Sequence, residues 1–309
     1  MKKRLFKLVL IMLIAAVASG LVNSKALAAR CGVDAIGNVD CAHNRTIEWY
    51  WYGLAYLPRV VHWQVPQGRS PSDGWPVVYW FEGTSPHYEN FIFTPFNRNY
   101  LDIAGNLFGL VNEAMTVRTL LDDVYNTGQK YAVIAPAPPS TGIVVQFWNT
   151  NCIFPYEISA DYAFFNHLFS RVDKGKYGHV NNKKRYATGV SSGGYNTSRM
   201  AVTFNRKNNF KALAIQSASY ANCAGALCSA CAGLAFIPSN HPPTKFYHGV
   251  YDPIVPAFTM RCYYDLLKRK GIPTEKLEFT DGGIAGLHGY STDSYSATDG
   301  IQEYFNRYQ

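Results

Sequence analysis

Residues 189–193 read GVSSG and fit the pattern G-x-S-x-G, in which a serine stands at the tip of a sharp turn between a strand and a helix. The positions two residues either side of Ser191 must be glycine, because a Cβ there would clash with the adjacent strand or helix. Gly194 extends this clearance, and the flanking KRYATGV and YNTSRMAVTF are typical of a buried strand and a helix. We therefore predict that Ser191 is a catalytic nucleophile. The alternative is a Gly/Ser-rich turn without function.

A serine hydroxyl is a poor nucleophile near neutral pH, so it needs a base within hydrogen-bond reach and a carboxylate that orients this base. After a serine turn of this kind the acid comes next along the chain and the histidine last. Asp252 follows TKFYHGV, a predicted strand, at the carboxyl end where sites in open α/β sheets are built. Pro253 and Pro256 restrict its loop to an extended path. We predict Asp252 as the acid. The alternative is that it only begins a turn.

His288 is the one histidine of eight that follows Asp252 in the sequence. It lies in DGGIAGLHG, a glycine-rich loop after the last predicted strand, which suits a side chain that must reach back over the sheet. We predict His288 as the general base, with an ordinary surface-loop histidine as the alternative. His248 lies inside a predicted strand and is interpreted as a structural histidine.

The negative charge that develops on an attacked carbonyl oxygen needs two backbone N–H groups aimed at it. One is expected from Ser192, directly after the nucleophile, and the other from Gly83 or Thr84, in the loop after WPVVYWFEG. Glu82 precedes these residues, and a carboxylate suits this place only if its side chain points away. The alternative for Glu82 is a charge hydrogen-bonded within the loop.

Aromatic residues make up 15% of the chain and gather in two segments. For the first, from Trp49 to Trp63, ordinary packing in the core and at the sheet edge is the interpretation that we favour over an apolar surface for a polymer. The second follows WPVVYWFEG and includes Phe91 and Phe93. Loops at this place commonly cover the site in such folds, so an apolar surface for an insoluble polymer and ordinary packing are equally open. Phe91, Phe93 and Tyr195 are the candidate substrate contacts.

The elements that must position these residues alternate between strands and helices. Strands are predicted over residues 75–83, 131–138, 184–190, 211–217, 244–250 and 276–280, and helices over residues 101–125, 159–175, 195–204, 263–271 and 299–309. This alternation predicts the α/β class, with a mostly parallel central sheet and helices on both faces. Together with the serine turn it predicts an α/β-hydrolase.

The N-terminus predicts export. Four basic residues within the first seven precede the apolar stretch LVLIMLIAAVASGLV, and Ala26-Leu27-Ala28 supplies the small residues of a cleavage site. We predict that residues 1–28 are a secretory signal and that residues 29–309 form a single catalytic domain, with an aromatic-rich leader over about residues 30–70. The expected location is the medium or the periplasm. No other apolar run in the sequence approaches the length of a membrane span.

The charge balance points to no particular partner. The chain has 29 basic and 21 acidic residues, but five of the basic ones lie within residues 1–28, so the excess falls from eight to three on cleavage. We infer neither a nucleic-acid partner nor an acidic one. The oligomeric state is left open.

All seven cysteines follow residue 28, and export makes disulfides their expected state. Cys31 could pair with Cys41 near the new N-terminus, and Cys223 could pair with Cys228 or Cys231. An odd count leaves at least one cysteine unpaired or joined to another molecule. A zinc site in the second group would need a further ligand cluster, and the sequence offers none. We predict no metal and no organic cofactor.

From about Trp75 to the C-terminus the chain resembles the extracellular medium-chain-length polyhydroxyalkanoate depolymerases. The stretches that carry the resemblance are ATGVSSGGYNTSRMAV, KALAIQSASYANC and HPPTKFYHGVYDPIVPAFTM. The resemblance implies a secreted serine esterase that cuts aliphatic polyesters of hydroxy acids, whether or not the polymer is soluble. It also implies Ser191, Asp252 and His288 as the triad.

Two other functions compete with this one. A carbohydrate-side-chain esterase, such as a feruloyl or acetyl esterase, would use the same residues and differ in the acyl group that it prefers. A non-catalytic binding protein on a hydrolase fold is the more distant alternative, and the complete order Ser191, Asp252, His288 argues against it.

Overall fold

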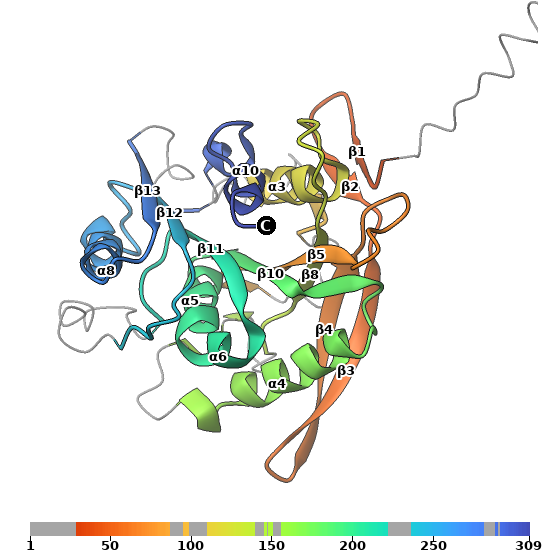
Figure 1. Ribbon diagram of the computed structural model, residues 1–309, viewed down its shortest axis with the longest axis horizontal. Coiled ribbons are helices and arrows are strands. Elements are labelled where there is room, and N and C mark those ends of the chain that lie inside the picture. Colours follow the sequence, from red (N-terminus) through yellow and green to blue (C-terminus); the bar gives the residue numbers. More distant parts are fainter. Residues whose placement is uncertain are drawn as a thin grey trace, which may run out of the picture.

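A mixed eight-stranded sheet forms the centre of the protein in the computed structural model (Figure 1). The structure describes residues 29–86, 95–98, 110–139, 145–146, 148–150, 156–221, 236–280, 288–289 and 291–309. In spatial order the strands are β13 (Thr274–Phe279), β12 (Thr244–Gly249), β11 (Phe210–Gln216), β10 (Val180–Val190), β5 (Trp75–Phe81), β8 (Ala132–Pro136), β4 (Ala55–Gln64) and β3 (Asn44–Tyr52).

Six of these strands run parallel, from β13 to β8, and β4 and β3 form an antiparallel hairpin at one edge. Every residue of β5, β8 and β12 is buried, as expected for strands covered on both faces. The prediction of a mostly parallel sheet in an α/β fold is therefore confirmed. Short strands lie beside this sheet: β1 (Cys31–Val33), β2 (Val39–Cys41), β6 (Ser85–Pro86), β7 (Asn97–Arg98) and β9 (Val145–Gln146).

Helices pack against both faces of the sheet. They are α3 (Leu110–Asp122), α4 (Ala160–Asp173), α5 (Ser192–Arg199), α6 (Asn205–Asn208), α8 (Ala257–Arg269) and α10 (Ile301–Asn306), with short turns η1 (Tyr156–Ile158), η2 (Met200–Phe204) and η4 (Thr292–Tyr295). Alternate residues of β5 divide between the two faces: Val78 and Trp80 belong to one core with α3 and α10, and Tyr79 and Phe81 to another with α4. The sheet thus separates two apolar layers, and α5 and α8 pack on the α4 side (Figure 1).

Two predicted helices begin earlier in the structure than the sequence pattern indicates. The helix after the serine turn begins at Ser192, earlier than predicted, and passes through the π-helical turn η2 before α6 ends at Asn208. The predicted helix 263–271 begins at Ala257, directly after Pro256, and ends at Arg269. The first turn of α5 begins Ser192-Gly193-Gly194 and has no apolar side chain at helical spacing, so the sequence pattern misses it.

The aromatic cluster of the leader lies in the β3–β4 hairpin at the edge of the sheet, and only part of its tip is packed. Tyr50 is buried, but Trp49 is 47% exposed, Trp51 66% and Tyr56 52%. An antiparallel edge hairpin presents alternate side chains to opposite faces, and only one face of this hairpin packs on α4. On the other face Tyr56 contacts both tryptophans, with ring centroids 5.3 Å and 5.0 Å apart.

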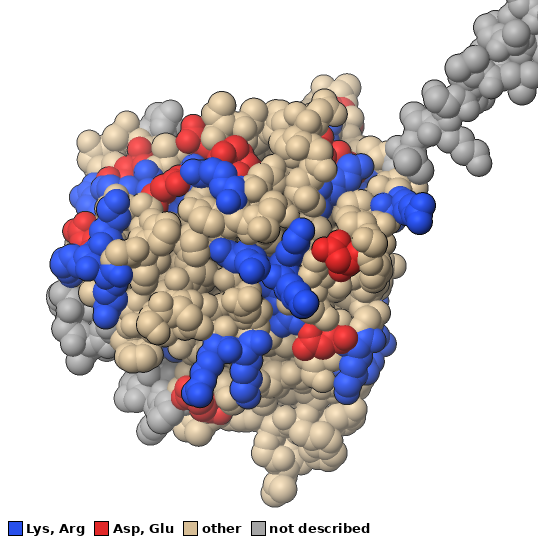
Figure 2. All heavy atoms as spheres, viewed as in Figure 1, with Lys and Arg blue, Asp and Glu red and all other residues tan. Residues whose placement is uncertain are grey.

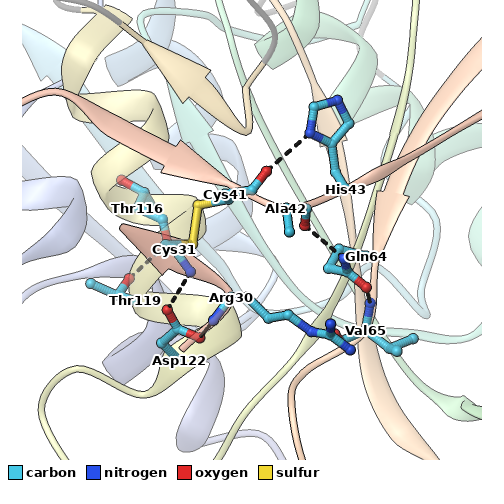
Figure 3. The surroundings of a disulfide bond; sticks show 10 residues. All are labelled: Arg30, Cys31, Cys41, Ala42, His43, Gln64, Val65, Thr116, Thr119 and Asp122. Atoms are coloured by element: carbon cyan, nitrogen blue, oxygen red, sulfur yellow. Dashed lines mark hydrogen bonds between the residues drawn. A yellow bond between two sulfur atoms is a disulfide. The ribbon is translucent and has the colours of Figure 1, made fainter. Parts of the chain in front are cut away.

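The start of the described chain is fixed by one disulfide and one carboxylate (Figure 3). Cys31 in β1 pairs with Cys41 in β2, which confirms the pairing that the sequence offered. Asp122, at the end of α3, accepts hydrogen bonds from the backbone N–H groups of Arg30 and Cys31 at 2.7 Å and 2.9 Å. Cys262 is a free thiol, and the remaining four cysteines lie outside the described residues.

Candidate active site

Ser191 stands between the end of β10 and the first residue of α5, with φ 53° and ψ −123°. A positive φ at a residue that is not glycine is uncommon and strained. A Cβ at Gly189 or Gly193 would overlap the carbonyl oxygen of Phe81, and one at Gly194 would overlap the Cβ of Ala218. The clearance argued from the sequence is therefore real, since each of these glycines sits where no side chain fits.

The structure brings Ser191, His288 and Asp252 into one hydrogen-bonded row. Nε2 of His288 lies 2.9 Å from Oγ of Ser191, and Nδ1 lies 2.8 Å from Oδ2 of Asp252. A carboxylate only accepts, so Nδ1 carries the proton and Nε2 is left to accept from the Ser191 hydroxyl. Both His288 and Asp252 are 5% exposed. This is the arrangement in which an imidazole can remove the proton of a serine hydroxyl.

Asp252 is itself held by its own loop. Its second oxygen, Oδ1, accepts hydrogen bonds from the backbone N–H groups of Ile254 and Val255, at 2.9 Å and 2.8 Å. One oxygen therefore orients the carboxylate on the backbone and leaves the other for His288. The alternative, that Asp252 only begins a turn, accounts for the contacts of Oδ1 but not for the contact of Oδ2 with His288.

His248 lies in β12 behind this row and is completely buried. Its Nε2 donates to the carbonyl oxygen of Val255 at 2.8 Å and lies 3.5 Å from Oδ2 of Asp252. Burial lowers the pKa of His248, which keeps the ring neutral at ordinary pH. His248 therefore packs against the carboxylate without placing a competing charge beside it.

The groups predicted to hold an oxyanion lie on either side of Ser191. Ser192 is the first residue of α5, where a backbone N–H has no partner within its own helix. A Cβ built on Gly83 would lie 3.5 Å from the Cβ of Ser191, so this glycine borders the nucleophile directly. Thr84 is exposed. Glu82 is buried, and its carbonyl oxygen accepts a 2.8 Å hydrogen bond from the indole of Trp148.

The predicted substrate contacts divide. Phe91 and Phe93 lie outside the described residues. Tyr195, in α5, is only 3% exposed and packs in the core with Ile215 and Met260, so little of its ring is open to a ligand. A role for Tyr195 in binding substrate stays a prediction.

Sequence reasoning did not single out several other residues near the site. Tyr251, Ile254 and Phe258 surround Asp252 along the chain and are 66%, 57% and 54% exposed. Ser217, directly after β11, hydrogen-bonds to the backbone of Gly289, next to His288. The available signal was position, because each of these residues lies at or after the carboxyl end of a predicted strand.

Comparisons with known proteins support both the fold and the chemistry. The poly(3-hydroxyoctanoate) depolymerase of Pseudomonas fluorescens is 41% identical over 249 residues, which cover 79% of this chain and 80% of that protein. No protein-family model matches. A ferulic acid esterase has a TM-score of 0.57 at 14% identity, covering 86% of this chain and 99% of its own. A thermostable esterase has a TM-score of 0.51 at 16% identity, covering 90% and 67%. The two structures show a shared α/β-hydrolase fold.

Proposed function

The chain belongs to the family of the poly(3-hydroxyoctanoate) depolymerase and is an ester hydrolase, and we propose that it is a secreted serine esterase that hydrolyses medium-chain-length aliphatic polyesters. The observation that carries the proposal is the row of hydrogen bonds from Ser191 through His288 to Asp252. The row contains a nucleophile, a base and an acid in the roles that acyl transfer to a serine requires.

In the first half of the proposed reaction, Oγ of Ser191 bonds to the ester carbonyl carbon while Nε2 of His288 takes the hydroxyl proton. Asp252 stabilises the imidazolium. The N–H groups of Ser192 and of Gly83 or Thr84 hold the charge on the carbonyl oxygen. When the C–O bond breaks, His288 gives its proton to the leaving alkoxide, and an acyl-Ser191 remains.

In the second half, water attacks the acyl group and His288 accepts its proton. The C–Oγ bond breaks, His288 returns the proton to Ser191, and the free acid leaves. On a polyester of hydroxy acids each cycle would give one new hydroxyl end and one new carboxylic acid end.

We propose that exposed apolar side chains near Asp252 in the sequence contact an aliphatic acyl chain of the substrate. Tyr251, Ile254 and Phe258 place apolar side chains in solvent on the loop that carries the acid and on the start of α8. Exposed apolar groups that gather beside a site are a feature of binding surfaces. They favour a hydrocarbon side chain in the substrate over a polysaccharide.

The β3–β4 hairpin gives the protein a second apolar surface, which suits contact with an insoluble polymer. β4 pairs with β8 only from Val61 to Gln64, so Ala55 to Val60 run on past the carboxyl end of β8. Six residues of strand span about 20 Å, and this extension lies at the sheet edge that carries Ser191. Residues 49–58 contain no charged side chain, and no Lys, Arg, Asp or Glu is seen at the protruding tip in Figure 2.

Export is proposed from two features. Residues 1–28 have the order of a secretory signal, and the Cys31–Cys41 disulfide suits an oxidising compartment. No helix within the described ranges has the length and apolar character needed to cross a bilayer.

The function is tested by hydrolysis of p-nitrophenyl acetate, octanoate and ferulate, together with clearing of a poly(3-hydroxyoctanoate) emulsion. We expect octanoate to be preferred and the emulsion to clear. Ser191→Ala should lower both activities by at least about 10⁴-fold. Ser219→Ala is the matched control, because Ser219 is also buried but its hydroxyl donates to the carbonyl of Thr259.

The outcomes separate the competing functions. Activity on acetate or ferulate without clearing of the emulsion would move the substrate to polysaccharide esters. Full activity of Ser191→Ala would remove the proposed mechanism. Absence of hydrolysis by the wild-type protein on every ester would favour a non-catalytic binding protein.

A further inference from the structure

Ser217 has an unusual backbone and a buried side chain. It directly follows β11, its φ is 44°, and it is completely buried. Ser191 has the same relation to the adjacent strand β10 and a similar φ of 53°. Strained residues that are not glycine persist only where their surroundings hold them, and they gather at functional sites. Ser191 and Ser217 are two such residues at the ends of neighbouring strands, so we expect a shared functional reason.

The hydroxyl of Ser217 binds both backbone groups of one distant residue. It donates to the carbonyl oxygen of Gly289 at 3.0 Å, and the N–H of Gly289 donates back to it at 3.1 Å. Gly289 directly follows His288 and is 72 residues away along the chain. One side chain therefore fixes the main chain beside the histidine in both directions.

Three neighbouring strands contribute to the same two residues. Ser191 after β10 and Asp252 after β12 bind the two ring nitrogens of His288, and Ser217 after the intervening β11 binds the backbone of Gly289. The backbone of Ser217 is in turn fixed on the sheet, because its N–H donates to the carbonyl of Tyr247 in β12 at 2.9 Å. The histidine is held by its ring on two sides and by its main chain on the third.

We propose that Ser217 is a positioning residue for the base His288. The inference rests on the proposed function, because it assigns Ser217 a task within the Ser191–His288–Asp252 row. During the cycle Nε2 of the ring exchanges protons with Ser191, the leaving group and water, so the hydrogen bonds at Nε2 are broken and remade while Nδ1 stays bonded to Asp252. The Ser217–Gly289 pair takes no part in these transfers. It keeps the backbone beside the imidazole in place while the hydrogen bonds at Nε2 change.

The test compares Ser217→Ala, Ser217→Gly and the control Ser219→Ala on p-nitrophenyl octanoate, with kcat expressed per active site titrated by an organophosphonate. Misplacement of a catalytic group by about 1 Å costs about 100-fold. We expect both Ser217 variants to lose about 10- to 100-fold in kcat with KM changed by less than about 2-fold. Ser219→Ala should keep kcat within about 2-fold.

Ser217→Gly separates positioning from folding. Glycine adopts a positive φ without strain, so this variant keeps the backbone conformation and loses the hydroxymethyl group, whereas Ser217→Ala loses only the hydroxyl. A merely structural role would lower the number of titrated sites, or the melting temperature, and leave kcat per site unchanged. Wild-type kcat per site in Ser217→Gly would overturn the proposal. If Ser191→Ala is inactive and both Ser217 variants are fully active, the esterase mechanism stands and only the positioning role fails.

Discussion

The carboxyl ends of β10, β11 and β12 and the tip of the β3–β4 hairpin both lie on the catalytic side of the sheet, yet they are built in opposite ways. At the strand ends four polar side chains each have a partner at hydrogen-bond distance: Ser191, which is partly exposed, and Ser217, Asp252 and His288, which are buried. At the hairpin tip the aromatic side chains are about half exposed and contact mainly one another.

Under the proposed function, the difference reflects what each region has to recognise. Acyl transfer requires a few atoms at fixed distances, so the strand ends accept strained backbone and glycine-only positions to hold them. Contact with an amorphous apolar surface requires exposed area without charge, and any of several rings can supply it. Single substitutions at the strand ends should therefore each cause a large loss of kcat or of stability. At the hairpin, several substitutions should have to be combined before adsorption to the polymer falls.

Asp252→Asn should have the largest effect on catalysis. Asparagine has one accepting oxygen where aspartate has two, and it carries no negative charge to stabilise the imidazolium. Loss of the carboxylate from a triad lowers kcat by about 10⁴-fold. Steady-state kinetics on p-nitrophenyl octanoate measures this. Asp265→Asn, an exposed aspartate in the nearby helix α8, is the control and should leave kcat unchanged. A loss below about 10-fold in Asp252→Asn would contradict the assigned role of the acid.

Gly193→Ala should have the largest effect on folding. The new Cβ would overlap backbone oxygen atoms of Phe81 and Glu82, which cannot move away as a side-chain end can. We expect the free energy of unfolding to fall by more than about 4 kcal/mol, in the range that marks a disrupted core. Gly32→Ala is the control, because its Cβ would meet the nearest atom at 3.9 Å. Equal urea midpoints for the two variants would show that the turn can accommodate a Cβ at residue 193.

Acid should weaken the buried part of the molecule before it affects the hairpin surface. Burial lowers the pKa of His241 to about 4, so the folded protein leaves this ring neutral while the unfolded chain, with a pKa near 6.5, protonates it. The stabilisation is complete above pH 6.5 and is lost as pH falls toward 4, at about 1.4 kcal/mol for each pH unit.

Urea unfolding at pH 7, 6 and 5 measures this slope, and His241→Gln should make it shallower by about that amount. His241 donates to the carbonyl of Pro242 and accepts from the hydroxyl of Tyr263 at 2.6 Å, as only a neutral ring can. An unchanged slope in the variant would show that His241 takes up its proton in the folded protein. Adsorption through tryptophan and tyrosine rings involves no group that titrates in this range.

The hairpin should show the smallest and most selective effect. Replacing Trp49, Trp51 and Tyr56 together by serine should lower adsorption to poly(3-hydroxyoctanoate) particles by about 10-fold, and kcat/KM on p-nitrophenyl octanoate should stay within about 2-fold. Particle depletion at several protein concentrations measures adsorption. Ile36→Ser, 61% exposed in the turn between β1 and β2, is the control. Equal adsorption of the triple variant and the wild type would exclude the hairpin as the polymer contact.

The two regions also differ in how far the sequence predicts them. Ser191, Asp252 and His288 are predictable because glycine spacing, chain order and strand ends each restrict the choice, and the three restrictions agree. Ser217 could not be found this way. A serine after a strand has no distinguishing pattern, and its contact with Gly289 depends on how two distant segments meet.

The exposed rings of the hairpin could not be predicted because aromatic content does not reveal which face of a strand is covered. The run WYWY alternates between a face packed on α4 and a face open to solvent, and composition averages the two. Strand β3 is also the edge of the sheet, which no local pattern reveals. The strand-end site follows from local rules, whereas exposure of the hairpin follows only from the assembled sheet.

The assignment of Ser191 as a nucleophile activated by His288 is tested most directly by organophosphonate labelling. The site and rate of labelling are measured by peptide mass spectrometry in the wild type and in His288→Ala. We expect one adduct per chain, on Ser191, with loss of esterase and emulsion-clearing activity in proportion to labelling. We also expect labelling to be at least about 10³-fold slower without His288. An adduct on another residue, or an equal rate in His288→Ala, would contradict the assignment of Ser191 as the nucleophile activated by His288.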